Sequence, residues 1–257
     1  MDSKRNTLER RSKILQMLNT DGKVSVKDLS NRFGVSEVSI RNDLVKLEEK
    51  GLLVRTRGGA IREKSNYKNT GLSDRLKQNF KEKMRIGKRA IDLIKEGDNV
   101  ILSAGSTVIP LAKQLSRLKN IRVITHSLPV IDELSHNSQM EVIQVGGVLR
   151  SKMRSLVGPI AEKTLGKLSC NTVFLSVEGI DLESGIFSPV IEEASLSKIA
   201  IGVSEKVVVL ADSSKFQRKS FAKVCSMDRI DVIITDKGIP DRTRNSLEKM
   251  GIEVIIA

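Results

Sequence analysis

The sequence predicts an α/β protein in which an N-terminal winged helix-turn-helix domain is joined to a larger, mostly parallel, Rossmann-like α/β domain. Two short amphipathic helical patterns, joined by a glycine-containing turn and followed by a basic strand, predict the first domain. From residue 100 onward, Val/Ile-rich runs alternate with helical patterns, which predicts a buried parallel sheet covered on both faces. An apolar content of 39% without tryptophan predicts an aliphatic core.

The net charge of the chain is positive and unevenly spread, which points to a polyanion as partner. The sequence carries 44 Lys/Arg against 31 Asp/Glu, a net charge of +13. Residues 1–85 hold 21 basic and 11 acidic side chains (+10), and residues 86–257 hold 23 and 20 (+3). A basic excess confined to one part of a chain is typical of nucleic-acid binding, with an affinity that falls as salt rises.

Metal, redox and membrane functions find little support in the sequence. Cys170 and Cys225 are isolated, and no Cys/His cluster or catalytic-triad spacing occurs, so we expect no metal, no cofactor and no disulfide. Residues 1–11 are polar and charged, and no apolar run approaches the roughly 18 residues of a membrane span. The sequence therefore predicts a cytoplasmic protein without a membrane partner.

The small domain is expected to occupy residues 1–60 and to begin with a helix over residues 8–20. Apolar residues recur at helical spacing in this segment. Arg10, Arg11 and Lys13 are expected at or near the phosphates of the polyanion.

A second, shorter helix is expected over residues 25–34. Ser25 and Asp28 form the start signature S-x-x-D, and Gly34 ends the apolar stripe. The Gly-Val-Ser link that follows is a tight turn into the next helix, which is a helix-turn-helix arrangement.

The third helix, expected over residues 36–51, is the one around which the domain is built. Ile40, Leu44 and Leu47 share one face because they recur at i, i+4 and i+7. A serine at its start and a glycine at its end are good caps. The apolar face packs inward, so the opposite face is available for binding.

That opposite face and the basic wing after it provide the groups expected to bind DNA. Residues 52–60 predict a strand and a Gly-Gly turn, and a winged helix places its second helix in the major groove. We expect Arg and Lys to bind phosphates and polar groups of the helix to contact base edges. The expected DNA-binding residues are Ser36, Glu37, Val38, Ser39, Arg41, Asn42, Lys46, Arg55 and Arg57.

The segment VSEVSIRNDLVKLEEKGLLVRTRGGA, residues 35–60, resembles the DNA-binding signature of the DeoR-type bacterial repressors in spacing and residue type. Asn42 departs from that signature, because the family usually has a second arginine after the position of Arg41. The resemblance implies a double-stranded DNA operator as partner and leaves the base preference open.

The larger domain is expected to follow a polar linker over residues 61–73 and to occupy residues 74–257. It begins with a long charged helical pattern over residues 74–96. Strands are expected at residues 100–102, 121–125, 141–145, 172–176, 207–211, 232–235 and 254–256. Helices are expected between several of these strands, at residues 108–117, 159–168, 191–203 and 241–250.

Polar residues follow several of the expected strands, and ligands of open α/β sheets bind beyond the carboxyl ends of the strands. A glycine with small hydroxyl residues at a helix start, as in residues 103–107, offers N–H groups to an anion, typically phosphate. Carboxylates and a lysine follow other strands, which suits a phosphorylated sugar or polyol. The expected effector-binding residues are Ser103, Ala104, Gly105, Ser106, Thr107, Gly146, Gly147, Glu178, Gly179 and Lys215.

The DeoR resemblance extends to these strand ends. It implies a sensor domain similar to ribose-5-phosphate isomerase that binds a phosphorylated sugar as inducer. The family usually has D-S-G-T-T where this chain has residues 103–107, and G-A-D-G where it has residues 176–179. Gly146-Gly147 and the D-S-S-K-F of residues 212–216 match. Ser103, Val177 and Glu178 depart from the pattern, which leaves the sugar open and keeps loss of sensing as an alternative.

Together these patterns predict a repressor of a sugar-metabolism operon that a phosphorylated sugar relieves. One winged helix is too small for tight specific binding, so we expect a homo-oligomer, a dimer or a tetramer, on repeated half-sites. Two alternatives stay open: an activator, and a sugar-phosphate isomerase in which Glu178, Asp181 or Lys215 moves a proton. Glu192 or Glu193 could face the pocket, and the basic loop at Arg150 is expected to be solvated or to act as a lid.

Overall fold

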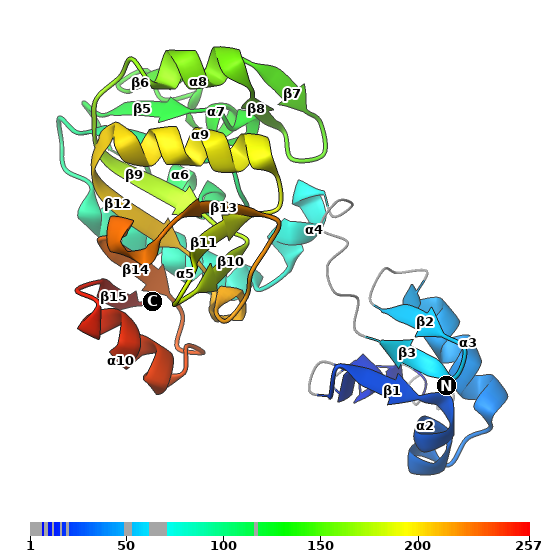
Figure 1. Cartoon of the computed structure of the whole chain (residues 1–257). Coiled ribbons are helices and arrows are strands. Elements are labelled where there is room, and N and C mark those ends of the chain that lie inside the picture. Colours follow the sequence, from blue (N-terminus) through cyan, green and yellow to red (C-terminus); the bar gives the residue numbers. More distant parts are fainter. Residues whose placement is uncertain are drawn as a thin grey trace. The chain divides into compact units, whose positions relative to one another are not determined.

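The structure is a computed structural model that describes residues 7, 10–11, 13–15, 17–18, 21–48, 53–61, 71–115 and 118–257. The chain divides into two compact units, residues 1–68 and 69–257 (Figure 1). The described residues between 7 and 18 are helical, as expected for the first helix. Most of the expected linker, residues 61–73, lies outside the described residues.

The smaller unit is a winged helix-turn-helix, as the sequence predicts. Its sheet has three antiparallel strands in the order β1-β3-β2. Strand β1 was not predicted, because three residues are too few to show a period. The elements are β1 (Lys23–Ser25), α2 (Val26–Phe33), α3 (Glu37–Glu48), β2 (Val54–Thr56) and β3 (Gly59–Ile61).

Local chemistry explains where these elements begin and end. The Ser25 hydroxyl accepts a hydrogen bond from the Asp28 amide at 3.0 Å and caps α2, which ends at Gly34 in the left-handed conformation. Ile40, Leu44 and the rest of the apolar face of α3 are buried in one aliphatic cluster. Gly59 is needed in β3, since a Cβ there would lie 1.9 Å from the Val24 carbonyl oxygen of β1.

The larger unit contains a sheet of seven parallel strands in the order β15-β14-β12-β9-β4-β5-β6. All seven expected strands are present. They are β4 (Asn99–Leu102), β5 (Arg122–Thr125), β6 (Glu141–Gln144), β9 (Cys170–Ser176), β12 (Ser204–Leu210), β14 (Val232–Thr235) and β15 (Glu253–Ile256).

Helices cover both faces of this sheet, and the strands are apolar on both sides for that reason (Figure 1). One core cluster joins Val100 and Leu102 to α5 (Phe80–Ala90), α6 (Ile109–Leu115) and α7 (Leu128–Leu134). The other joins the opposite face of the sheet to helices that include α8 (Pro159–Leu165), α9 (Ile191–Gly202) and α10 (Asp241–Lys249).

One expectation for the larger unit needs correction. The pattern over residues 74–96 is not one helix but α4 (Leu72–Lys77), α5 and the 3-10 turn η1 (Ile91–Leu93), because Asn79 takes a left-handed φ of 49°. Short antiparallel strands that the sequence did not predict form two separate sheets. They are β7 (Val148–Arg150) with β8 (Ser155–Val157), and β10 (Gly179–Asp181), β11 (Gly185–Ser188) and β13 (Ala222–Cys225).

The strand order reverses between β4 and β9, and this places a crevice in the fold. From β4 the chain builds outward through β5 and β6, and it then returns to β9 on the other side of β4. Loops leaving neighbouring strands in opposite directions separate at such a switch point, and ligands of open α/β sheets bind there. The segments after β4 and β9 are the ones that the sequence marks as a phosphate loop and a carboxylate.

Candidate DNA-recognition surface and ligand pocket

The outer face of α3 presents the residues expected to meet DNA. Val38 is 66% exposed, and Arg41, Asn42 and Lys46 are also exposed, whereas the apolar face is buried. Ser36 caps the helix start, because its hydroxyl accepts from the Ser39 amide at 3.3 Å. The surface is therefore a row of short polar and basic groups on a helix whose other face is anchored.

Asp43 ties α3 to the first helix from the inside. It is 1% exposed, and its two carboxylate oxygens accept from Arg10 Nε at 2.6 Å and Arg11 Nε at 2.7 Å. Arg10 and Arg11 thus position α3 through their Nε atoms, and the expectation that these two arginines lie at or near phosphates stays a prediction. Lys13 remains exposed.

The wing carries its two expected arginines on the surface. Arg55 lies on β2 and pairs with Glu48 at the end of α3, with Nε 2.9 Å from Oε2. Arg57 lies in the exposed turn between β2 and β3. The pair with Glu48 fixes the wing against the end of α3.

A pocket lies at the switch point of the larger unit. It is a small cavity of about 40 Å³. Seven of the expected effector-binding residues contribute to its walls: Ser103, Ala104, Gly105, Ser106, Thr107, Glu178 and Lys215. The other lining residues that matter below are Arg75, Gln78, Lys83, His126, Ser188 and Glu193.

The loop after β4 is held rigidly against β9. The Ser103 hydroxyl accepts from the Ser176 amide at 2.9 Å, and Gly105, with φ of 146°, lies where a Cβ would be 2.4 Å from the Ser176 Cβ. The Ala104 amide donates to His126 Nε2 at 3.1 Å. Ser103, which replaces the usual family aspartate, thus serves as a link between the two strands.

His126 is a pocket residue that the sequence did not reveal. It is buried, and burial lowers its pKa from 6.5 to about 4, so the imidazole is neutral near pH 7. A neutral ring can accept from Ala104 at one nitrogen while the other nitrogen carries the proton. A lone histidine after a strand gives no sequence signal that separates this role from plain core packing.

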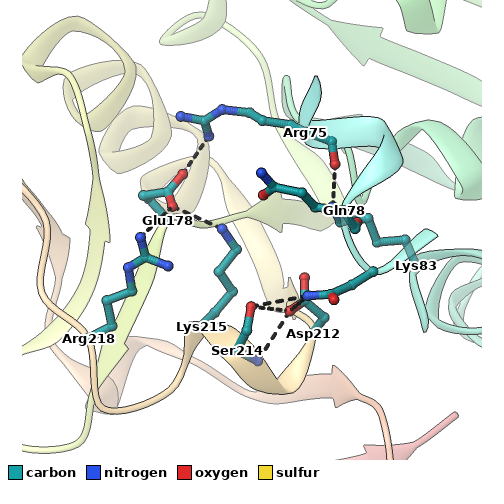
Figure 2. Close-up of polar contacts among 9 residues, drawn as sticks. Arg75, Gln78, Lys83, Glu178, Asp212, Ser214, Lys215 and Arg218 are labelled. Carbon is teal, nitrogen blue, oxygen red and sulfur yellow. Dashed lines mark hydrogen bonds and ion pairs between the residues drawn. The ribbon is translucent and has the colours of Figure 1, made fainter. Parts of the chain in front are cut away.

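Glu178 is the centre of the charge in the pocket (Figure 2). It is 3% exposed, and its oxygens accept from Arg75 Nη1 at 2.5 Å and Lys215 Nζ at 2.9 Å. Arg218 Nη2 stands 3.7 Å from the same carboxylate. One carboxylate therefore faces three cations, and the excess of positive charge suits an anionic ligand.

Lys83 of α5 forms part of the pocket wall. Its buried ammonium donates to the carbonyl oxygens of Arg75 and Gln78, both at 2.6 Å, and burial lowers its pKa. Asn79, whose backbone is left-handed, donates from Nδ2 to Asp212 Oδ1 at 2.7 Å. The bonds of Lys83 join α5 to the end of α4, and the bond of Asn79 joins the segment between these helices to the residue that follows β12 and Ala211.

Three expected effector-binding glycines do not line this pocket. A Cβ at Gly147 would lie 2.6 Å from the Val157 carbonyl oxygen, and Gly146 packs near Ile160. A Cβ at Gly179 would lie 2.3 Å from the Arg218 carbonyl oxygen. Close backbone packing accounts for Gly147 and Gly179, whereas a Cβ at Gly146 would only touch the Ile160 side chain at 3.4 Å.

Glu193, and not Glu192, lines the pocket. Burial raises the pKa of Glu193, and its carboxylate pairs with Arg150 and lies 3.3 Å from the Ser188 hydroxyl. Arg150 is thus held by an ion pair, which revises the expectation of a solvated loop residue. No group of His, Cys, Asp or Glu able to hold a metal occurs among the described residues.

In the part of the chain that the structure describes, no helix is long and apolar enough to cross a membrane. The winged helix and the pocketed α/β unit together define a class of protein: a DNA-binding regulator with a ligand-binding domain.

The chain belongs to the DeoR family of transcriptional regulators. Its residues 10–66 match the model of the DeoR-like helix-turn-helix domain, and its residues 78–237 match the model of the DeoR C terminal sensor domain. The match identifies a regulator and not an enzyme, so the isomerase alternative is set aside.

Relatives along nearly the whole chain carry regulator names. A protein of Escherichia coli O157:H7 named for transcriptional repression of the aga operon is 38% identical over 97% of this chain and 94% of its own length. GlcR of Bacillus subtilis, an HTH-type transcriptional repressor, is 34% identical over 96% and 95%. Ribose 5-phosphate isomerase A of Methanocaldococcus jannaschii aligns over 54% of this chain and 55% of its own, with 17% identity and a TM-score of 0.41. That score is too low to bear on function.

Proposed function

We propose that this regulator represses a sugar-metabolism operon and that a phosphorylated sugar in the switch-point pocket relieves the repression. The observation that carries the proposal is the pocket itself. The glycine and hydroxyl loop of residues 103–107 meets Lys215 and Arg75 there, around a buried carboxylate. Backbone N–H groups and cations suit phosphate, and carboxylates suit sugar hydroxyls.

The names of relatives favour a sugar operon as the target. GlcR and the protein named for the aga operon are called repressors. A Haemophilus influenzae protein that is 33% identical over 95% of this chain is called the L-fucose operon activator. The second candidate function is therefore activation, and not repression, of such an operon.

On the DNA side, we propose that Val38, Ser39, Arg41 and Asn42 contact base edges, with Ser36 and Glu37 at the helix start beside them. Lys46, Arg55 and Arg57 provide phosphate contacts. The proposed domain bounds are residues 1–60 and 74–257, with the linker between them. We further propose a cytoplasmic dimer or tetramer that places two or more α3 helices on repeated half-sites.

Ligand binding changes transcription only if the ligand prefers the form with weaker operator affinity. The test is thermal melting of the full chain against a panel of phosphorylated sugars, including amino-sugar and ketose phosphates. A specific ligand at a hundredfold excess over Kd stabilises the native state by about 2.7 kcal/mol. The same ligand must release a DNA fragment that the protein has selected from a random pool.

Two serine variants locate the site. Ser106→Asp places a carboxylate in the buried loop and is expected to abolish the rise in melting temperature, because it repels the phosphate. Ser138→Asp makes the same change in an exposed turn outside this pocket and is expected to leave the rise intact. A panel without any stabilising sugar phosphate would contradict the proposal.

A further inference from the structure

Helix α4 lies in the part of the chain that neither family model covers. The two matches end at residue 66 and begin again at residue 78, and α4 spans Leu72–Lys77 between them. It is also the first element that the structure describes after the wing. Whatever moves α4 therefore moves the point at which the chain enters the larger unit.

Few contacts fasten α4 to the larger unit. The Leu72 amide donates to the Lys152 carbonyl oxygen at 2.9 Å, and the Leu72 side chain packs in a small cluster with Ile109 and Met153. This cluster is separate from both large cores of the sheet. Other attachments run through the pocket, from Arg75 to Glu178 and from Lys83 to the carbonyl groups at the end of α4, and Asn79 after the helix donates to Asp212.

Arg75 reaches from α4 into the pocket, with only 16% of its side chain exposed (Figure 2). One guanidinium nitrogen binds Glu178, while its Nε is buried and has no hydrogen-bond acceptor among the described residues. A buried guanidinium donor without an acceptor is costly. Arg75 thus has unused capacity for an oxygen atom that is not part of the chain.

The cations of the pocket are already paired within the chain. Glu178 accepts from Arg75 and Lys215, which are the groups that a phosphate would otherwise bind. A phosphate group can therefore bind them only by taking them from Glu178, and the element that carries such a cation must then adjust.

Of the walls, α4 is the one that can move at low cost. The loop of residues 103–107 is bonded to β9 and to His126, and Lys215 lies in the 3-10 turn η2 (Ser213–Lys215), which follows core strand β12 after two residues. Helix α4 has six residues and one small apolar anchor. Its strongest link is the ion pair of Arg75 with Glu178. A phosphate group, which is also an anion, can take the place of the Glu178 carboxylate as the partner of Arg75.

We propose that Glu178 is an internal anion that holds Arg75 and α4 over the pocket when no ligand is bound, and that the phosphate group of a ligand takes Arg75 from Glu178 and shifts α4 outward. This inference rests on the proposed function and adds the route by which ligand binding reaches the linker. Arg75 is thereby the residue that converts phosphate binding into movement of α4. The selectivity is for a phosphate group, since a neutral sugar cannot replace the carboxylate at Arg75.

The test is hydrogen exchange of the amides in residues 71–79 of the full chain, with inorganic phosphate against chloride at equal ionic strength. In the natural protein, phosphate is expected to speed exchange in α4 about tenfold, the equivalent of one charge-assisted hydrogen bond. In Arg75→Gln, exchange is expected to be fast in both salts, and the phosphate Kd to rise about tenfold. Lys77→Gln is the matched control, since Lys77 is exposed on the same helix and the variant is expected to behave as the natural protein.

The outcomes separate this inference from the proposed function. If sugar phosphates raise the melting temperature but inorganic phosphate leaves α4 exchange unchanged or slower, the α4 inference is overturned and the proposed function stands. Phosphate binding to Arg75→Gln with unchanged Kd also overturns it. If no sugar phosphate binds, the proposed function itself fails. The exchange measurement on the natural protein does not depend on whether a variant folds. Arg75→Lys keeps the positive charge and is expected to bind phosphate more tightly than Arg75→Gln.

Discussion

The Asp43 carboxylate offers the sharpest test of how the recognition helix is held. In Asp43→Asn one acceptor oxygen is lost, and the new amide NH2 faces a guanidinium donor. The two bonds are 2.6 and 2.7 Å long, and the carboxylate side chain is 2% exposed. A charge-assisted bond contributes about 1.5–3 kcal/mol, and breaking a buried pair costs about 3–5 kcal/mol. Since Arg10 and Arg11 keep 17% and 23% exposure, we expect a loss of about 2–4 kcal/mol.

That loss is large for a unit of this size. At about 0.05–0.15 kcal/mol per residue, the 68 residues of the first unit have a stability of about 3–10 kcal/mol. Urea unfolding followed by hydrogen exchange in α2 and α3 measures the change, and operator affinity is expected to fall with it. Glu37→Gln is the matched control, because its pair with Arg41 is exposed and contributes about 0.5 kcal/mol or less. Equal losses of stability in the two variants would refute the idea that Asp43 holds α3 through Arg10 and Arg11.

Three further predictions concern single residues. Arg41→Ala is expected to lower operator affinity about tenfold or more without changing the melting temperature, since its partner Glu37 is exposed; unchanged affinity by fluorescence anisotropy would exclude Arg41 as a base contact. Gly105→Ala is expected to cost more than about 2 kcal/mol in urea unfolding because of the clash with Ser176, whereas Gly97→Ala, with φ of 89° and open space, should cost only about 1 kcal/mol. The pKa of His126 is lowered to about 4, so the stability that its neutral ring contributes is complete above pH 6.5. As the pH falls from 6.5 toward 4, the free energy of unfolding is expected to drop by about 3 kcal/mol, and His126→Gln should remove this dependence. Identical pH profiles of stability for the two proteins would contradict the assignment.

Elements with a long and regular pattern could be predicted from the sequence alone. Ile40, Leu44 and Leu47 define the buried face of α3, and each is buried in the structure. Strand β10 has three residues and begins at Gly179, so it shows no period. The same glycine was interpreted as part of a ligand loop, although contact with the Arg218 backbone explains it. Local patterns do not report such long-range packing.

The candidate pocket was predictable only in part, for the same reason. Residues in the loops that follow core strands, such as Ser106, Glu178 and Lys215, are placed together by the rule for parallel sheets. Arg75 and Lys83 lie on helices and reach the pocket only because the chain breaks at Asn79. At that break the Asn79 side chain donates to Asp212, a residue 133 positions away. Asparagine adopts the left-handed conformation more readily than most residues, but an asparagine within a helical pattern does not by itself predict a break.

The pairing of β4 with β9 has a consequence for how the chain folds as it is made. Strands β4, β5 and β6 can pair as soon as they leave the ribosome, but the free edge of β4 waits for partners more than 70 residues later, such as Thr172 for Val100. An unpaired strand edge is the surface most open to wrong pairing during that interval. The pocket walls come from the loops after β4 and after β9, so they meet only when these two strands pair. A molecule bound in the pocket therefore also stabilises the pairing of β4 with β9.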